Sequence, residues 1–295
     1  MAASFWESSH RRTWLFERGA LERAYAQMED GLAPQERHRL KVYFTEQIQK
    51  LGRHAKVRQR VIATANVLFR RFYTKNLLCD YDPFLVAPTC LYLASKAEEC
   101  TVQAKIWTRM QNKYDVAAML EMEMFLIEEL EYSLVVFHPY RCGKTIPTDG
   151  RGALPPLPNS GSVIGARRPL MQILADAELQ ELTKYSWSLV NDSYHTDICL
   201  LYPPHMCALA CVYTAAVLMG KELRPWLESL NIDLDEVTNI TRELLAYYES
   251  YKQGDPKQMN ELIRKTTDFR AASQQQQGEH SAAAAQRAPP LPPQQ

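Results

Sequence analysis

The sequence predicts an all-α protein made of two related helical units, and two observations carry this prediction. Apolar residues recur at spacings of three and four along most of the chain, as in Leu40, Phe44, Ile48 and Leu51. This is the period of an amphipathic helix. Residues of the first half also return in the second half at a constant register. Strand-like alternation is short and isolated, so we do not expect a sheet.

Capping and turn residues delimit the helices of the first half. Gly52 follows one apolar segment, and a second segment runs from Val61 to Phe72. Asp82 and Pro83 form a typical helix start, because aspartate caps exposed N–H groups and proline is tolerated at the first helical position. The residues that follow are almost continuously apolar, which predicts a helix buried on most sides.

The two halves resemble each other most in this apolar helix. PFLVAPTCLYLA begins at Pro83 and PHMCALACVYTA begins at Pro204, 121 residues later. The helix beginning at Asp115 likewise resembles the one beginning at Asp235. Small residues on one stripe let neighbouring helices pack closely around a central helix, so we infer a duplicated unit of about five helices. The identical pairs are Pro83/Pro204, Ala87/Ala208, Cys90/Cys211, Tyr92/Tyr213 and Ala94/Ala215.

The composition divides the chain further into segments. Five of the 17 prolines and five of the 11 glycines lie in the segment from Cys142 to Pro169, which is typical of a linker. The Gln- and Ala-rich end lacks the apolar residues needed to order itself. We therefore expect an N-terminal helical segment (1–33), a first unit (34–141), a linker (142–168), a second unit (169–254), a short C-terminal helix (255–270) and a disordered tail (271–295).

Charge and cysteine usage argue against several kinds of chemistry. The chain has 34 basic and 34 acidic residues, a balance that weighs against coating nucleic acid through bulk charge. Its seven cysteines form no C-x-x-C pair, so we expect neither a disulfide framework nor a metal site. No phosphate-binding glycine loop or nucleophile elbow is present. No apolar run approaches the roughly 18 residues of a membrane span. We expect no cofactor and no enzymatic activity.

Several motifs resemble the cyclin family, and specifically its C-type members. They are FWESSH (Phe5–His10), RQRVIATANVLFRRFY (Arg58–Tyr73), DPFLVAPTCLYLASKAEE (Asp82–Glu99), HPYR (His138–Arg141) and VNDSYHTDICLLYPP (Val190–Pro204). The resemblance implies tandem five-helix cyclin boxes with an N-terminal helix. It also implies a non-catalytic subunit that activates the Mediator-associated cyclin-dependent kinase, which regulates RNA polymerase II transcription. Other subunits of the Mediator kinase module would be partners, and the nucleus would be the location.

Two charged residues lie at the edges of apolar helix stripes and are candidates for kinase binding. Lys96 follows Tyr92 and Leu93 near the end of the most apolar helix, and Glu123 lies among apolar residues. Burying charges in such places costs free energy unless they pair within the protein or interact with a binding partner. By resemblance they match the lysine–glutamate pair with which cyclins hold the kinase. The alternative is an ordinary salt bridge inside the bundle.

The resemblance implies that further residues of this chain contact the kinase. Glu98 and Glu99 would face its activation segment, although a solvated helix end is the simpler interpretation. Phe5 and Trp6 begin an aromatic N-terminal segment that either contacts a kinase helix or packs against the first unit.

In the second half, four residues match a surface groove that takes an activating Mediator subunit in C-type cyclins. They are Trp187, Asn191, Asp192 and Tyr248. An aromatic side chain beside amide and carboxylate groups suits a binding hot spot, but a tryptophan on an amphipathic helix is more often part of the core.

Two other functions remain open at this point. Transcription factor IIB shares the duplicated cyclin fold and touches DNA, and basic residues at Arg53–Arg60 and Arg70–Arg71 would suit a nucleic-acid surface. The chain could also be a cyclin for a different transcriptional kinase.

Overall fold

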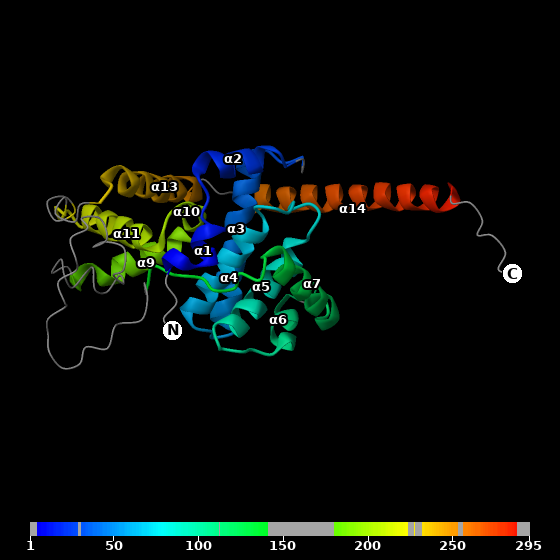
Figure 1. The fold of residues 1–295 in the computed structure, drawn as a ribbon, viewed down its shortest axis with the longest axis horizontal. Coiled ribbons are helices and arrows are strands. Elements are labelled where there is room, and N and C mark those ends of the chain that lie inside the picture. The colour runs from blue at the N-terminus through cyan, green and yellow to red at the C-terminus, as the bar shows by residue number, and fades with distance from the viewer. Residues whose placement is uncertain are drawn as a thin grey trace.

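The computed structural model describes residues 5–28, 31–111, 113–140, 180–223, 227, 232–252 and 256–287. All regular elements in these ranges are helices, which confirms the predicted fold class. Figure 1 shows α9, α11 and α13 gathered on one side of the long helix α3 and α5, α6 and α7 on the other. The linker 142–168 lies outside the described residues.

The first unit is built around one apolar helix. Its described helices are α3 (Pro34–His54), α4 (Gln59–Phe72), α5 (Pro83–Ala97), α6 (Ala104–Gln111) and α7 (Val116–Glu129). Helix α5 packs against the other four. It begins as predicted, because the Asp82 carboxylate accepts the N–H of Phe84 at 3.0 Å. The small residues Ala87, Cys90 and Ala94 are fully buried.

The second unit repeats this arrangement around α11. Its described helices are α9 (Thr183–Ser193), α10 (Ile198–Leu201), α11 (Pro204–Leu218) and α13 (Leu234–Lys252). Helix α11 has the same length as α5, 15 residues, and also begins at a proline. It packs against α9 and α13. Ala208, Cys211 and Ala215 are fully buried, like their counterparts in α5. The structure thus supports the duplication inferred from sequence.

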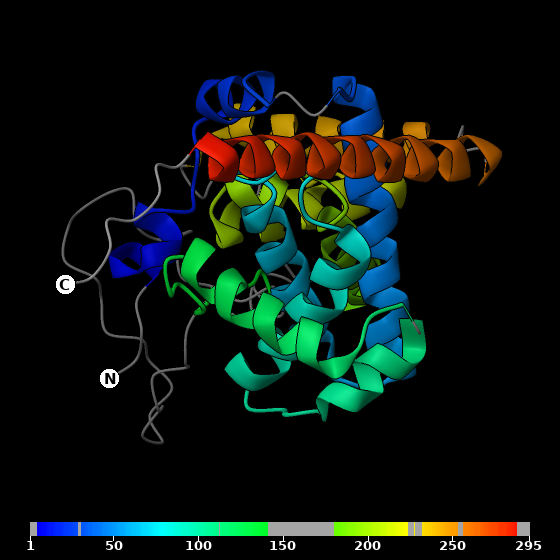
Figure 2. The ribbon, with the colours of Figure 1, turned by 90° about the vertical axis from the view of Figure 1, so that its right-hand side faces the viewer.

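The terminal segments lie against the two units. The N-terminal elements are η1 (Phe5–Glu7), α1 (Ser9–Arg12) and α2 (Arg18–Ala26), and the C-terminal one is α14 (Pro256–Arg287). Figure 2 shows α14 crossing α3. Arg270 of α14 donates to the carbonyl oxygens of Cys79 at 2.8 Å and Leu78 at 3.2 Å. These bonds dock the helix on the first unit.

Helix α14 is longer than expected. We predicted a helix over 255–270 and disorder from Ala271, whereas the structure continues the helix to Arg287. Alanine and glutamine are good helix formers, and a helix already nucleated by its docked first half adds residues without a new nucleation cost. Residues 288–295 lie outside the described part of the chain.

Arg70 of α4 connects the two units inside the core. It has no exposed surface, its Nε donates to the carbonyl oxygen of Tyr194 at 2.8 Å, and its Nη1 pairs with the carboxylate of Asp197. Burial tends to raise the pKa of Asp197, but the charges of Lys41 and Arg70 outweigh it and hold the pKa at about 2. The carboxylate is therefore charged and compensates the buried guanidinium.

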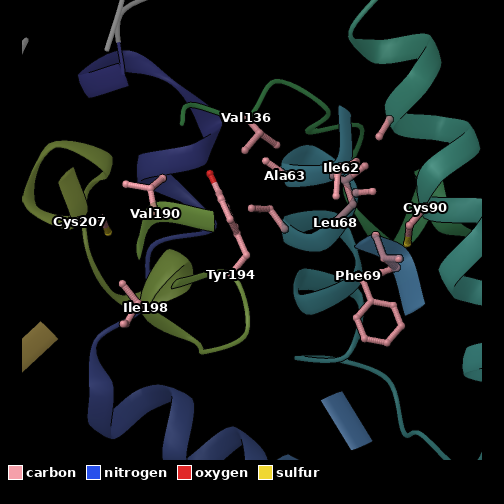
Figure 3. Packing of buried hydrophobic residues seen from close by; sticks show 14 of the residues in the cluster. Ile62, Ala63, Leu68, Phe69, Cys90, Val136, Val190, Tyr194, Ile198 and Cys207 are labelled. Atoms are coloured by element: carbon pink, nitrogen blue, oxygen red, sulfur yellow. The ribbon is translucent and has the colours of Figure 1, made fainter. Parts of the chain in front are cut away.

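A second buried connection passes through His138. Its Nε2 lies 2.8 Å from Oγ1 of Thr64 in α4, and its Nδ1 lies 2.7 Å from the hydroxyl oxygen of Tyr194. Figure 3 shows Tyr194 between second-unit residues such as Val190 and α4 residues such as Ala63. Burial, with help from the charges of Arg60 and Arg71, lowers the pKa of His138 to about 3.

We expect Asp197→Ala to destabilise the protein strongly, because it leaves the Arg70 guanidinium buried without its counter-charge. The loss in free energy of unfolding should be about 3 kcal/mol, measured by urea denaturation. Lys50→Ala is the control, since it removes only the exposed pair with Glu46, worth about 0.5 kcal/mol or less. Equal losses in the two variants would contradict the role given to Arg70.

The buried histidine predicts acid sensitivity. Because the folded pKa of His138 lies below that of an unfolded histidine, near 6.5, the unfolded chain binds the proton first as pH falls. Stability should therefore be complete above about pH 6.5 and decline toward pH 3, by about 1.4 kcal/mol per pH unit for this group.

His138→Gln should flatten the decline measured by urea denaturation between pH 6.5 and 5.5. His54→Gln, a change at an exposed histidine, should leave it as in the wild type. An unchanged slope in His138→Gln would show that another group controls the acid response.

Candidate functional site

Lys96 and Glu123 lie together, at the C-terminal end of α5 and in the middle of α7. Their side chains form an ion pair between Nζ and Oε1, and the Lys96 ammonium lies 4.5 Å from the centre of the Tyr92 ring. Only 5% of the glutamate side chain is exposed, against 39% of the lysine. The pair is a salt bridge within the bundle, as one interpretation of the sequence expected, but its cation faces solvent.

Apolar side chains on α7 and in the residues that follow it are unusually exposed. Leu120 and Met124, one helical turn apart on α7, are 41% and 68% exposed, and Tyr132 and Val135 are 75% and 60% exposed. Tyr132 also has a positive φ of 55°, which is costly for an aromatic residue. Sequence analysis did not select these residues, because a helix rich in apolar residues appears buried on all sides. We call this set with Lys96 and Glu123 the first face.

The two glutamates at the end of α5 differ from each other. Glu98 is turned inward, where its carboxylate accepts the hydroxyl proton of Thr64 at 2.7 Å and pairs with Nε of Arg60 at 2.5 Å. Glu99 is exposed and has a left-handed backbone, with φ of 54°. The structure thus leaves only Glu99 of the two free to meet a partner directly.

Phe5 and Trp6 pack across the junction of the two units. The Phe5 ring contacts Phe137 edge to face, with centroids 5.7 Å apart, and the Trp6 ring lies 5.7 Å from that of His205 in α11. The Arg11 guanidinium lies over the Trp6 ring, 5.0 Å from the ring centre. Both aromatic residues are half-buried, so packing accounts for part of each surface and leaves the rest exposed.

The four groove residues also lie together, between α9 and α13. The Tyr248 hydroxyl donates to Asp192 at 2.6 Å, and Trp187 lies one turn before Asn191 on α9. Burial raises the pKa of Asp192, while the bond from Tyr248 acts against that rise. Trp187 is 37% exposed, so it belongs to the surface rather than to the core.

Two residues of the first unit contact this cluster, and neither was a candidate from the sequence. Gln59, at the start of α4, donates to the side-chain oxygen of Asn191 at 3.0 Å, and the Tyr140 hydroxyl donates to the same oxygen. The Tyr140 ring also lies 4.6 Å from the ring of Trp187. The HPYR motif was the only sequence signal for Tyr140. The residues that the sequence assigned to a groove are thus in contact with the first unit.

The described residues offer little to a small ligand. Two cavities enclose about 10 Å³ each, which is room for one water molecule. Within the same residues, no group of three histidine, cysteine or acidic side chains is placed to hold a metal. None of the helices in these ranges is both long and apolar enough to cross a membrane.

The basic residues considered for nucleic acid do not form one surface. Arg70 and Arg71 are both fully buried. Arg70 is committed to Asp197, and Arg71 donates to the carbonyl oxygen of Ser133 at 3.1 Å. Neither can contact a phosphate, so the expected basic surface reduces to the exposed residues of Arg53–Arg60.

Sequence comparison identifies the relatives of this fold. Residues 18–135 match the family model described as Cyclin, N-terminal domain. The chain is 41% identical to Cyclin-C1-1 of Oryza sativa subsp. japonica over 261 residues, which cover 85% of this chain and 91% of the relative. It is 35% identical to Cyclin-C of Rattus norvegicus over 283 residues, which cover 90% of each chain.

Two solved structures share the fold. A chain of the yeast TFIIK (Kin28/Ccl1/Tfb3) complex matches with a TM-score of 0.61 at 21% identity, over 81% of this chain and 98% of that one. A chain of the yeast RNA Pol II CTD kinase CTDK-1 complex matches with a TM-score of 0.61 at 16% identity, over 82% and 75%. With its duplicated helical units and these relatives, the chain belongs to the cyclin family, among its C-type members.

Proposed function

We propose that this chain is the non-catalytic regulatory subunit of a cyclin-dependent kinase, of the Mediator-associated type that controls RNA polymerase II transcription. The kinship with C-type cyclins supports the kinase class. The observation that carries the proposal is the first face, which combines a partly exposed cation paired with α7 and exposed apolar side chains on α7 and just after it. Its site of action is the nucleus, and its partners are proteins rather than nucleic acid.

The first face supplies two kinds of interaction. Exposed side chains such as Met124 and Tyr132 lose water on binding and provide most of the affinity. The Lys96 ammonium has three N–H donors and pairs with Glu123, so further donors can reach carbonyl oxygens at the end of a kinase helix. Glu123 holds the ammonium in place, and the pair fixes the register of the two proteins.

The proposed activation depends on which part of the kinase the cyclin contacts. By docking on the kinase's mobile regulatory helix, the first face favours the conformation in which the kinase's own Lys–Glu pair and metal-binding aspartate align. The chain contributes no group to phosphoryl transfer in this proposal. It activates the kinase by binding the active conformation more tightly than the inactive one.

The groove is a second site, for another subunit of the Mediator kinase module. The Trp187 ring offers an aromatic surface backed by Tyr140, and Asp192 with Tyr248 offers hydrogen-bonding groups beside it. Since residues of the first unit contact the groove residues of the second, a partner bound there would also favour the present relative placement of the two units.

Replacing both Lys96 and Glu123 by alanine should weaken kinase capture. We expect the affinity to fall at least about tenfold, equivalent to about 1.4 kcal/mol, in pull-down or interferometry with the purified kinase. The circular dichroism spectrum should not change.

The matched control is Lys50→Ala with Glu46→Ala, which removes a lysine–glutamate pair from α3 and should not affect capture. Undiminished capture by the Lys96/Glu123 variant would place the kinase interface elsewhere.

Trp187→Ala should separate the two sites. We expect it to abolish capture of the module subunit that binds the groove and to leave kinase capture intact, because the first face is untouched. Affinity purification followed by mass spectrometry measures both. Tyr185→Ala, on the same helix and also exposed, is the control. Loss of the kinase and the subunit together in Trp187→Ala would show that the groove is not an independent site.

A further inference from the structure

Basic residues crowd around the turn between α3 and α4. Two of them have acidic partners, since Lys50 lies 3.6 Å from Glu46 and Arg60 pairs with Glu98. Three more basic residues lie between Lys50 and Arg60 in the sequence. In the part of the chain that the structure describes, no carboxylate lies within salt-bridge distance of their charged atoms. These three exposed residues, which we call the basic ridge, are Arg53, Lys56 and Arg58.

Helix stability does not account for the ridge. Arg53 and Lys56 suit the C-terminal end of α3, where the helix dipole favours a cation, but Arg58 lies at the N-terminus of α4, where the dipole disfavours one. Arg58 occupies the N-cap position of α4 and makes no capping hydrogen bond with its side chain. Lys56 has a φ of 54°, a conformation that glycine or asparagine adopts at lower cost. Residues that oppose local preferences in this way often serve binding.

The ridge is held rigidly. Gly52 of α3 faces Ile62 of α4 so closely that a Cβ atom on the glycine would lie 2.5 Å from the isoleucine Cγ1. The two helices therefore meet at a fixed distance directly beside the turn. The backbone that carries the three charges is therefore preorganised, which reduces the conformational entropy lost when a ligand binds.

The ridge borders the groove. Gln59, which follows Arg58, donates to Asn191 in the groove at 3.0 Å. Through Gln59, the ridge thus adjoins the residues assigned to the groove.

We propose that the basic ridge binds an acidic segment of the partner protein that occupies the groove. The residues next to this segment in the partner's sequence lie in the groove. This inference rests on the groove assigned above and names the charge of its partner. A peptide can place acidic residues on the ridge and uncharged residues beside Asp192, whereas a nucleic acid carries a phosphate at every nucleotide and would be repelled by Asp192. The two arginines that would have lengthened the patch, Arg70 and Arg71, are buried. Three cations match a short acidic stretch but cover only a small part of a nucleic-acid backbone.

The test measures binding of fluorescein-labelled decaglutamate to the full chain by anisotropy at low salt. The ridge variant is Arg53→Gln with Arg58→Gln. The matched control is Lys105→Gln with Arg109→Gln, which removes two exposed cations from α6. We expect the ridge variant to bind about fivefold or more weakly, from two surface charge contacts, and the control to bind like the wild type. Rising salt should weaken the wild-type interaction.

Three results would overturn the inference. They are equal binding of decaglutamate by the ridge variant and the wild type, equal weakening in the control, and tighter wild-type binding of a single-stranded oligonucleotide of the same charge than of decaglutamate. The last would favour a nucleic-acid surface. The assay contains no kinase and does not use the first face, so its failure leaves the kinase proposal standing, and a failure of kinase capture leaves the ridge standing.

Discussion

The buried guanidinium of Arg70 holds the two units of this cyclin against each other. Its charge is compensated only where Asp197 and the carbonyl oxygen of Tyr194 meet it, and an uncompensated buried charge would cost several kcal/mol. The second unit can therefore dock on α4 in only one register. The groove depends on that register, because Gln59 at the start of the same helix reaches Asn191 of α9.

The duplicated units keep the same core but have diverged at their surfaces. Tyr73 and Tyr194 occupy matching positions, yet the first bonds to a carbonyl oxygen within its own unit and the second bonds to His138 of the other. The position that corresponds to Lys96 is Val217, which is 55% exposed. Only the first unit therefore carries a charge at this position, and the second unit supplies contacts between units.

Features set by neighbours in sequence could be predicted, and those set by distant residues could not. The Asp82 cap and the following helix are local, so composition and spacing revealed them. Lys96 and Glu123 were also found, because a charge beside an apolar stripe is unusual anywhere. Arg70 looked like part of an exposed basic patch. Its burial depends on Asp197, 127 residues later, and nothing in the sequence around Arg70 indicates that partner.

The central claim is that the first face, and not the second unit, receives the kinase. Hydrogen–deuterium exchange of the chain with and without the purified kinase tests this claim most directly. We expect added protection at the end of α5 and through α7 to Val135, with α11 and α13 unchanged. Protection confined to α11 and α13, with none around Lys96 and Glu123, would contradict the account.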